Sequence, residues 1–179
     1  MTVHRVIVGG LGTNCYILES NGTALIIDPG DEAEKILERL GDLETLRILA
    51  THRHSDHISA LGKVKKVLRK KAAIHRLDWV AGFDEELHDG QSIEFGGEEL
   101  SVIHTPGHTP GGCCFLVGDV LISGDTLFPN GPGNTSFPGG DEKAIRRSIR
   151  DKLMVLPDRT VVYPGHGPET TIGKERRLY

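Results

Sequence analysis

The chain has 179 residues, of which 37% are hydrophobic and 26% are charged, enough for one domain with an apolar core of its own. No run approaches the roughly 20 apolar residues of a membrane span, and no basic segment leads into an apolar one as in a secretory signal, so we expect a cytoplasmic protein with no membrane partner. The formal net charge of −4 gives no general attraction to nucleic acid, which we therefore do not expect as a partner.

The first third of the chain is predicted to alternate strands with one helix. Asn21-Gly22 separates two apolar runs, which is a strong signal for the turn of a β-hairpin. The segment 31–40 begins with acidic residues, places Ile36 and Leu40 on one face and is followed by a glycine, which predicts a helix. The predicted strands in this part cover residues 3–8, 14–18, 24–27 and 46–50.

The rest of the chain repeats this alternation. Residues 58–71 carry Leu61, Val64 and Leu68 at helical spacing with basic residues on the other side, which predicts an amphipathic helix whose basic face lies in solvent rather than on nucleic acid. This order of elements is typical of two sheets with helices on their outer faces. The remaining predicted elements are strands at 72–74, 92–95, 100–103, 113–117, 120–122 and 160–163, helices at 142–156 and 172–177, and a Gly/Pro-rich loop at 129–140 that can border a site.

The sequence shows no protein nucleophile. Cys15, Cys113 and Cys114 lie in apolar, strand-like segments, where a reduced and inert buried thiol is the simpler interpretation. No Gly-x-Ser-x-Gly motif is present. The glycine-rich segment 9–12 precedes another strand rather than a helix, so we interpret it as a turn between strands and not as a nucleotide-binding loop.

Histidines and aspartates gather directly after the strand predicted at 46–50. His52 and His54 are two residues apart in an extended chain, so their side chains point the same way and can bind one ion together. Asp56 and His57 follow at the start of the next helix, where the chain turns and presents a carboxylate and an imidazole to a neighbouring position. One segment can therefore supply two adjacent metal sites.

Three further candidates, His108, Asp125 and His166, stand alone at the ends of strand-like runs in Gly/Pro-rich turns. A single histidine in such a turn is more simply a surface or capping residue. Together with the cluster at 52–57, however, a metal centre is the simpler explanation for all of them. Imidazole and carboxylate ligands without a thiolate suit Zn, which we favour, and also Fe or Mn.

The motifs also carry a family resemblance. His-x-His-x-Asp-His at 52–57, His-Thr-Pro-Gly-His at 104–108, Ser-Gly-Asp-Thr at 123–126 and Pro-Gly-His at 164–166 resemble those of the metallo-β-lactamase superfamily in kind and in order. Within that superfamily, residues 13–177 resemble most closely the glyoxalase II-like hydrolases. The resemblance implies an α/β fold, the αββα sandwich, in which two mixed sheets pack face to face and helices cover both outer faces.

The resemblance further implies a role for each candidate residue. It implies two divalent metal ions, the first on His52, His54 and His108, the second on Asp56, His57 and His166, with Asp125 bridging both. Asp56 and Asp125 are then the catalytic carboxylates, and a metal-bridging hydroxide attacks the substrate carbonyl. Asp28 resembles a family aspartate that supports a metal-binding histidine, while a plain turn residue is an equally good interpretation.

The activity implied by the resemblance is that of a metallohydrolase that cleaves a thioester, such as S-lactoylglutathione, or a related ester. A small-molecule (thio)ester is therefore the expected partner. One alternative is an oxidoreductase that resembles the persulfide dioxygenases, which use a single Fe on the equivalents of His52, His108 and Asp125. A lactonase or a nuclease of the same fold is a third candidate.

The chain departs from the family pattern at two places. We expect a single domain over residues 1–179, without the C-terminal helical domain of full-length glyoxalase II. Asn134 and Ser136 stand where glyoxalase II and persulfide dioxygenases often carry Arg and Asp. The motifs therefore predict the metal centre but neither the substrate-binding residues nor the oligomeric state.

Overall fold

Strand β2, Thr13–Ser20, buries side chains on both of its faces. Because successive side chains of a strand point to opposite sides, Cys15 and Ile17 enter one apolar cluster while Tyr16 and Leu18 enter another. A strand of this kind needs a covering layer on each side. The computed structural model, which describes residues 1–179, supplies both layers as a second sheet on one side and helices on the other.

The first sheet contains six strands in the order β1-β2-β3-β4-β5-β6. Strands β1, β2 and β3 are antiparallel neighbours, whereas β4, β5 and β6 continue the sheet in parallel to β3. The bounds of the strands other than β2 are β1 Thr2–Val8, β3 Thr23–Ile27, β4 Glu44–Leu49, β5 Ala72–His75 and β6 Glu85–Leu87.

The second sheet contains six strands in the order β14-β13-β10-β9-β8-β7. Strands β10 and β13 are parallel, and all other neighbours are antiparallel. Its strands are β7 Ser92–Phe95, β8 Glu98–His104, β9 Cys113–Val117, β10 Val120–Gly124, β13 Val161–Pro164 and β14 Thr170–Thr171. A separate small hairpin joins β11 Leu127–Phe128 to β12 Gly131–Pro132.

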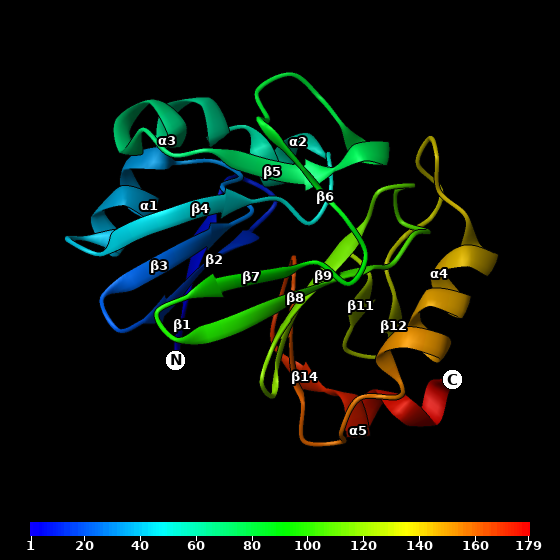
Figure 1. The fold of residues 1–179 in the computed structure, drawn as a ribbon. Helices are drawn as coiled ribbons and strands as arrows, with labels where there is room; N and C mark the ends of the chain where they lie inside the picture. The colour runs from blue at the N-terminus through cyan, green and yellow to red at the C-terminus, as the bar shows by residue number, and fades with distance from the viewer.

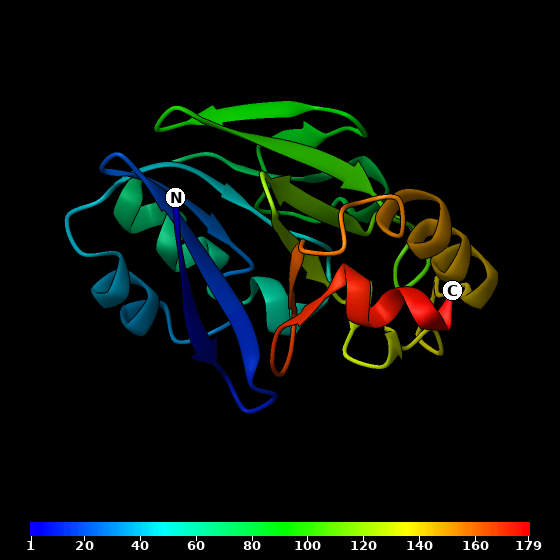
Figure 2. The same ribbon diagram turned by 90° about the horizontal axis from the view of Figure 1, so that it is seen from below.

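Helices cover the outer face of each sheet, as Figure 1 shows, and Figure 2 shows the two groups of helices on opposite sides of the molecule. The first sheet is covered by α1 Ala33–Leu40, α2 Ser55–Ile58 and α3 Leu61–Leu68. The second is covered by α4 Glu142–Ser148, the π-helical turn η2 Ile149–Leu153, α5 Ile172–Glu175 and the 3₁₀-helix η3 Arg176–Leu178. A further 3₁₀-helix, η1 Arg76–Asp78, follows β5. None of these helices has the length and apolar character required to span a bilayer.

The predicted fold class, an αββα sandwich of two mixed sheets, is confirmed. The hairpin expected at Asn21-Gly22 is also confirmed, since both residues have positive φ, 45° and 79°. The amphipathic helix predicted at 58–71 is present but shorter, as α3 with Leu61 and Val64 buried. The chain forms α2 before it, and α3 ends early because Arg69 adopts a left-handed conformation with φ 54°.

Several further differences concern the ends of elements. Helix α1 begins two residues later than predicted because Glu32 has φ 47°. The helix predicted at 142–156 is α-helical only to Ser148 and then widens into η2. The short strands β6, β11, β12 and β14 were not predicted, because strands of two or three residues carry too few side chains for a hydrophobic pattern.

The candidate residues lie where the two sheets meet at one edge. Cys113 N–H donates to Thr51 O at 2.8 Å, which joins the end of β9 to the segment after β4. On the other side, Gly165 N–H donates to Gly124 O at 2.8 Å and Asn14 N–H donates to Gly165 O at 2.7 Å. These backbone bonds fix the loops after β4, β10 and β13 against one another.

Candidate metal centre

The segment after β4 carries four of the candidate ligands and places them in two directions. His52 is buried, and His54 precedes α2 in an extended conformation with φ −63° and ψ 143°. The two imidazole centroids are therefore only 4.7 Å apart. Asp56 and His57 then lie in the first turn of α2, where the change to helical backbone turns them to a second position.

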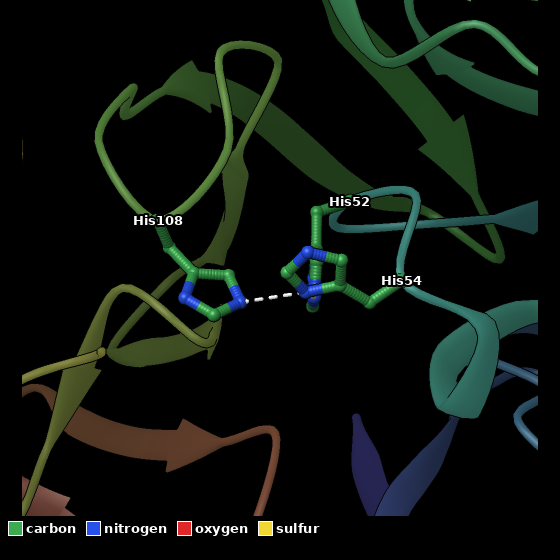
Figure 3. A group of neighbouring side chains, drawn as sticks. All are labelled: His52, His54 and His108. Atoms are coloured by element: carbon green, nitrogen blue, oxygen red, sulfur yellow. Dashed lines mark hydrogen bonds between the residues drawn. The ribbon is translucent and has the colours of Figure 1, made fainter. Parts of the chain in front are cut away.

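Three imidazoles form the first triad, His52, His54 and His108, in which the loop between β8 and β9 contributes His108. Figure 3 shows the three rings turned toward one another. His54 Nδ1 lies 3.1 Å from His52 Nε2 and 2.9 Å from His108 Nε2. Three ring nitrogens thus face a common point.

The second triad consists of Asp56, His57 and His166, in which the loop after β13 contributes His166. His57 Nε2 lies 3.3 Å from His166 Nε2, and Asp56 Oδ2 lies 3.4 Å and 3.2 Å from these two nitrogens. Thr13 Oγ1 donates to Asp56 Oδ2 at 3.0 Å and orients this carboxylate. The second triad therefore combines a carboxylate with imidazoles.

Asp125, which follows β10, lies between the two triads. Its Oδ1 is 3.5 Å from His57 Nε2, and its Oδ2 is 3.5 Å from His108 Nε2 and 3.7 Å from His166 Nε2. The structure thus brings together all the side chains that the sequence singled out, namely His52, His54, Asp56, His57, His108, Asp125 and His166.

The outer nitrogens of three imidazoles are held by hydrogen bonds. His57 Nδ1 donates to Asp28 Oδ2 at 2.9 Å, His108 Nδ1 to Asn134 O at 2.6 Å and His166 Nδ1 to Leu11 O at 3.2 Å. A neutral imidazole that donates from Nδ1 has a free lone pair on Nε2. In its neutral form, which a bound cation would favour, each of these three rings directs an acceptor nitrogen into the centre.

A short chain of hydrogen bonds fixes His52 in the same way. Thr51 Oγ1 donates to Asp28 Oδ2 at 2.7 Å and can accept from His52 Nδ1, which lies 3.0 Å away. Asp28 also accepts from the backbone N–H of Thr51 at 2.7 Å. Asp28 is thus buried behind both triads, supports His57 and His52, and is not merely a turn residue.

The electrostatic environments of the two triads differ. Burial, together with the neighbouring His57 and His108, lowers the pKa of His52 well below its usual value, and burial and His108 also lower that of His54. Burial acts in the same direction on His57, but Asp28 and Asp125 outweigh it and raise its pKa to about 9. The pKa values of His52 and His54 are therefore lowered in the first triad, whereas anionic groups raise that of His57 in the second.

The second triad holds one further perturbed pair. Burial alone would raise the pKa of Asp56, but the hydrogen bond with His166 and the charge of His57 outweigh it and lower that pKa. The same hydrogen bond raises the pKa of His166. Asp56 is accordingly ionised at neutral pH.

These residues fit a metal ion. His54 Nδ1 lies about 3 Å from His52 Nε2 and from His108 Nε2. A proton on His54 Nδ1 can bond to only one of these two neighbours, whereas a cation among the rings can be bound by all three. Asp125 Oδ1 is buried and has no hydrogen-bond partner, as expected for a ligand oxygen. A Cβ on Gly165 would lie 2.1 Å from this oxygen, so the backbone there leaves room only for the carboxylate.

The three cysteines are free and buried, as predicted. Burial raises the pKa of Cys15 and Cys113 well above the usual value and that of Cys114 to about 11, which keeps all three as unreactive thiols. Asn134 and Ser136 bond to each other, since Asn134 Oδ1 accepts from Ser136 N at 2.9 Å and from Ser136 Oγ at 2.8 Å. This pair stabilises the loop whose carbonyl holds His108.

Two residues near the centre were not predicted from the sequence. Phe137, in the predicted loop 129–140, is 48% exposed, and its ring centroid lies 5.3 Å from that of His54 and 5.9 Å from that of His108. The Gly/Pro-rich composition predicted a loop beside the site, but no pattern singled out this side chain. The second residue is Asp78, which is fully buried behind the first triad and belongs to no motif.

Comparisons with known proteins are consistent with this geometry. The family described as Metallo-beta-lactamase superfamily matches residues 8–166. The chain is 40% identical to an uncharacterized protein of Aquifex aeolicus (strain VF5), covering 98% of this chain and 94% of the relative. It is 34% identical to the probable metallo-hydrolase YqgX of Bacillus subtilis (strain 168), covering 98% and 95%. It is 32% identical to the hydroxyacylglutathione hydrolase GloC of Haemophilus influenzae, covering 99% and 96%.

Solved structures show the same architecture. The B3 metallo-beta-lactamase BLEG-1 superposes with a TM-score of 0.89 at 35% identity, covering 97% of this chain and 95% of that chain. TTHA1623, solved in a di-iron-bound form, gives a TM-score of 0.86 at 35% identity, covering 98% of both chains. ETHE1 from Myxococcus xanthus gives 0.91 at 28% identity, covering 99% of this chain and 82% of that chain.

Proposed function

The chain belongs to the metallo-β-lactamase superfamily, and from this premise we propose that it is a binuclear metal-dependent hydrolase of thioesters such as S-lactoylglutathione. One observation carries the proposal. Seven imidazole and carboxylate side chains converge from four loops, and the carboxylate of Asp125 faces both triads. A site for one ion would not require the second triad.

Asp125 and Asp56 have different roles in the proposed reaction. Divalent ions held here would supply Lewis acidity, which lowers the pKa of water toward about 7 and polarises a carbonyl. Asp125 sets the separation of the two triads through its two oxygens. Asp56, kept ionised and oriented by Thr13 Oγ1, can accept a hydrogen bond or a proton from the attacking water at Oδ2.

Two observations favour a thioester as the substrate. The chain is similar over nearly its whole length to the hydroxyacylglutathione hydrolase GloC of Haemophilus influenzae. The cysteines are buried with raised pKa values, so they cannot form an acyl-enzyme, and water must attack directly. Phe137 offers an apolar surface beside the first triad for the acyl part of such a substrate.

A second candidate is a single-iron oxidoreductase of the persulfide dioxygenase kind. His52, His108 and Asp125 lie together, as that activity requires, and the likeness to ETHE1 from Myxococcus xanthus supports it. The complete second triad argues for the hydrolase. In an enzyme with a single iron, Asp56, His57 and His166 would have no metal ion to hold.

Metal analysis together with an activity assay tests the proposal. We expect about two metal ions per chain, hydrolysis of S-lactoylglutathione, and loss of hydrolysis in His54→Ala. His88→Ala, which changes an exposed histidine outside the centre, is the matched control and should behave as the unchanged chain. One Fe per chain, oxygen uptake with glutathione persulfide and no thioester cleavage would instead establish the oxidoreductase.

Removal of the metal gives a second test. Ions that bind only the folded chain stabilise it by about 2.7 kcal/mol when present at a hundred times their dissociation constant. Treatment with a chelator should therefore lower the melting temperature, and restoring the metal should recover it. An unchanged melting temperature on chelation would contradict tight binding to the folded state.

A further inference from the structure

Asp78, at the end of η1, is a fully buried carboxylate outside the two triads. It takes part in no ion pair with lysine or arginine, and a buried carboxylate without such a partner is costly unless hydrogen bonds satisfy it. Three donors do so. Arg53 N–H and Thr109 Oγ1 donate to Oδ2 at 3.1 Å and 2.6 Å, and Gly111 N–H donates to Oδ1 at 2.8 Å.

These donors belong to the two loops that carry the first triad. Arg53 lies between His52 and His54, and Thr109 directly follows His108. One loop extends from β4 of the first sheet and the other connects β8 to β9 of the second, and a single backbone bond, from Cys113 N–H to Thr51 O, joins them at their base. The carboxylate of Asp78 bonds to both.

The contact is also close. A Cβ on Gly111 would lie 2.6 Å from the backbone nitrogen of Asp78 and 2.7 Å from its side chain, so glycine is needed for this approach. Asp28, by contrast, bonds to Thr51 and His57 and makes no bond to the loop of His108. Asp78 therefore adds a side-chain link between the two loops of the first triad, beside the ligands, to the backbone bond between Cys113 and Thr51.

We propose that Asp78 is a positioning residue for the first triad, which holds His52 and His54 at the distance from His108 that one ion requires. The loops are then assembled before an ion binds, so binding does not have to order them. The inference rests on the proposed metal-dependent function, but it is tested by metal binding without substrate.

The test uses Asp78→Asn, which keeps the shape of the side chain. The amide can satisfy only one side of the contact, because its NH₂ group would face an N–H or O–H donor. We expect the affinity for one of two ions to fall about 10- to 100-fold while the affinity for the other changes little. Asp84→Asn is the matched control, since Asp84 is an exposed aspartate in the same β5–β6 connection that accepts from Ala72 N–H.

Co²⁺ titration with a competing chelator, followed by the visible absorption of bound Co²⁺, separates the two affinities. Thr109→Val removes one donor of the same contact, and Thr109→Ser restores the hydroxyl. We expect Thr109→Val to lower the affinity for the same ion that Asp78→Asn affects, and Thr109→Ser to restore that affinity. This pair keeps the test decisive if Asp78→Asn does not fold.

A purely structural role would lower the melting temperature and leave both Co²⁺ affinities unchanged, and that result would overturn the inference. Equal weakening of both ions would overturn it as well. A third result concerns the proposed function alone: the unchanged chain binds two ions, Asp78→Asn lowers only one of the two affinities, and no thioester is cleaved. That result would refute the proposed function and leave the role of Asp78 intact.

Discussion

The first and second triads lie side by side but are built from different chemistry. The first consists of three imidazoles, and burial lowers the pKa of His52 and His54. In the second, Asp56 and the neighbouring Asp28 raise the pKa of His166 and His57 respectively. The second triad therefore pairs its imidazoles with carboxylates, whereas the first contains no carboxylate of its own and is held by hydrogen bonds from its loops.

Removing the carboxylate shared by both triads should have the largest effect. In Asp125→Asn, an amide NH₂ must face either His57 or the pair His108 and His166, which weakens both metal positions. We expect thioester hydrolysis to fall by at least about 100-fold, the upper end of losses seen for groups that only support ligands. Steady-state kinetics and metal analysis provide the measurement.

The control for this variant is Asp119→Asn, an exposed aspartate in the turn between β9 and β10 that pairs with Arg159. It should leave activity and metal content unchanged. If Asp125→Asn lost one ion and kept the other at full affinity, Asp125 would belong to a single triad and the binuclear arrangement would be wrong.

A methyl group added at Gly165 should cause the next largest loss of activity, and it should displace the second triad more than the first. The added Cβ would lie 2.1 Å from Asp125 Oδ1 and 2.7 Å from His57 Cε1. The backbone cannot retreat, because Gly165 is bonded to Asn14 and Gly124. Displacement of a reacting group by about 1 Å can cost a factor of 10² in rate, so we expect Gly165→Ala to reduce kcat on this scale.

Gly10→Ala is the control for the added methyl group, because a Cβ at Gly10 meets no atom within 4 Å. Crystal structures or Co²⁺ spectra of the two variants would show which triad moves. An active Gly165→Ala enzyme with normal metal content would mean that the loop after β13 is less constrained than its hydrogen bonds indicate.

Asp28→Asn should lower the metal affinity of the second triad more than that of the first. Asp28 accepts from His57 Nδ1 and, through Thr51, supports His52, so the variant weakens the second triad directly and the first only indirectly. We expect about a tenfold loss of affinity for one ion, and a different ion from that lost in Asp78→Asn. The double variant should then show additive losses in a Co²⁺ titration, and strong coupling would contradict separate roles.

Phe137→Ala should have the smallest effect. The ring contacts His54 and His108 but is half exposed, so it contributes apolar surface rather than a ligand. We expect an increase in KM within about tenfold and an unchanged metal content. Phe137→Leu keeps an apolar side chain and should restore most of the loss, whereas loss of metal in either variant would show that the ring supports the first triad.

The side chains of the centre could be predicted because their pattern is local. His52, His54, Asp56 and His57 follow one buried strand at spacings that backbone geometry interprets directly. His108, Asp125 and His166 could be added only through their turns and the family resemblance. Asp78 had no such signal, because its role depends on donors from segments that are distant in sequence and adjacent only in the fold.

The longer elements of the fold could also be predicted because their patterns are local, whereas very short strands and a break between helices could not. Strands of four or more residues were found, while β6, with three residues, and β11, β12 and β14, with two each, were not. The break between α2 and α3 at Ser59 and Ala60 interrupts a continuous helical pattern. At the break Ala60 N–H donates to Pro29 O at 3.0 Å, a contact with a segment distant in sequence that local propensity does not encode.

The loops of the centre are far apart along the chain, since His57 and His166 are separated by 109 residues and His54 and His108 by 54. The three cysteines are free, so no covalent link ties these segments together. An ion held between them would act as a reversible cross-link of the folded chain, since it joins loops that belong to both sheets. Loss of the ion would remove this cross-link and leave the backbone bonds between the loops, so the loops of the centre should become more susceptible to limited proteolysis when metal is withheld.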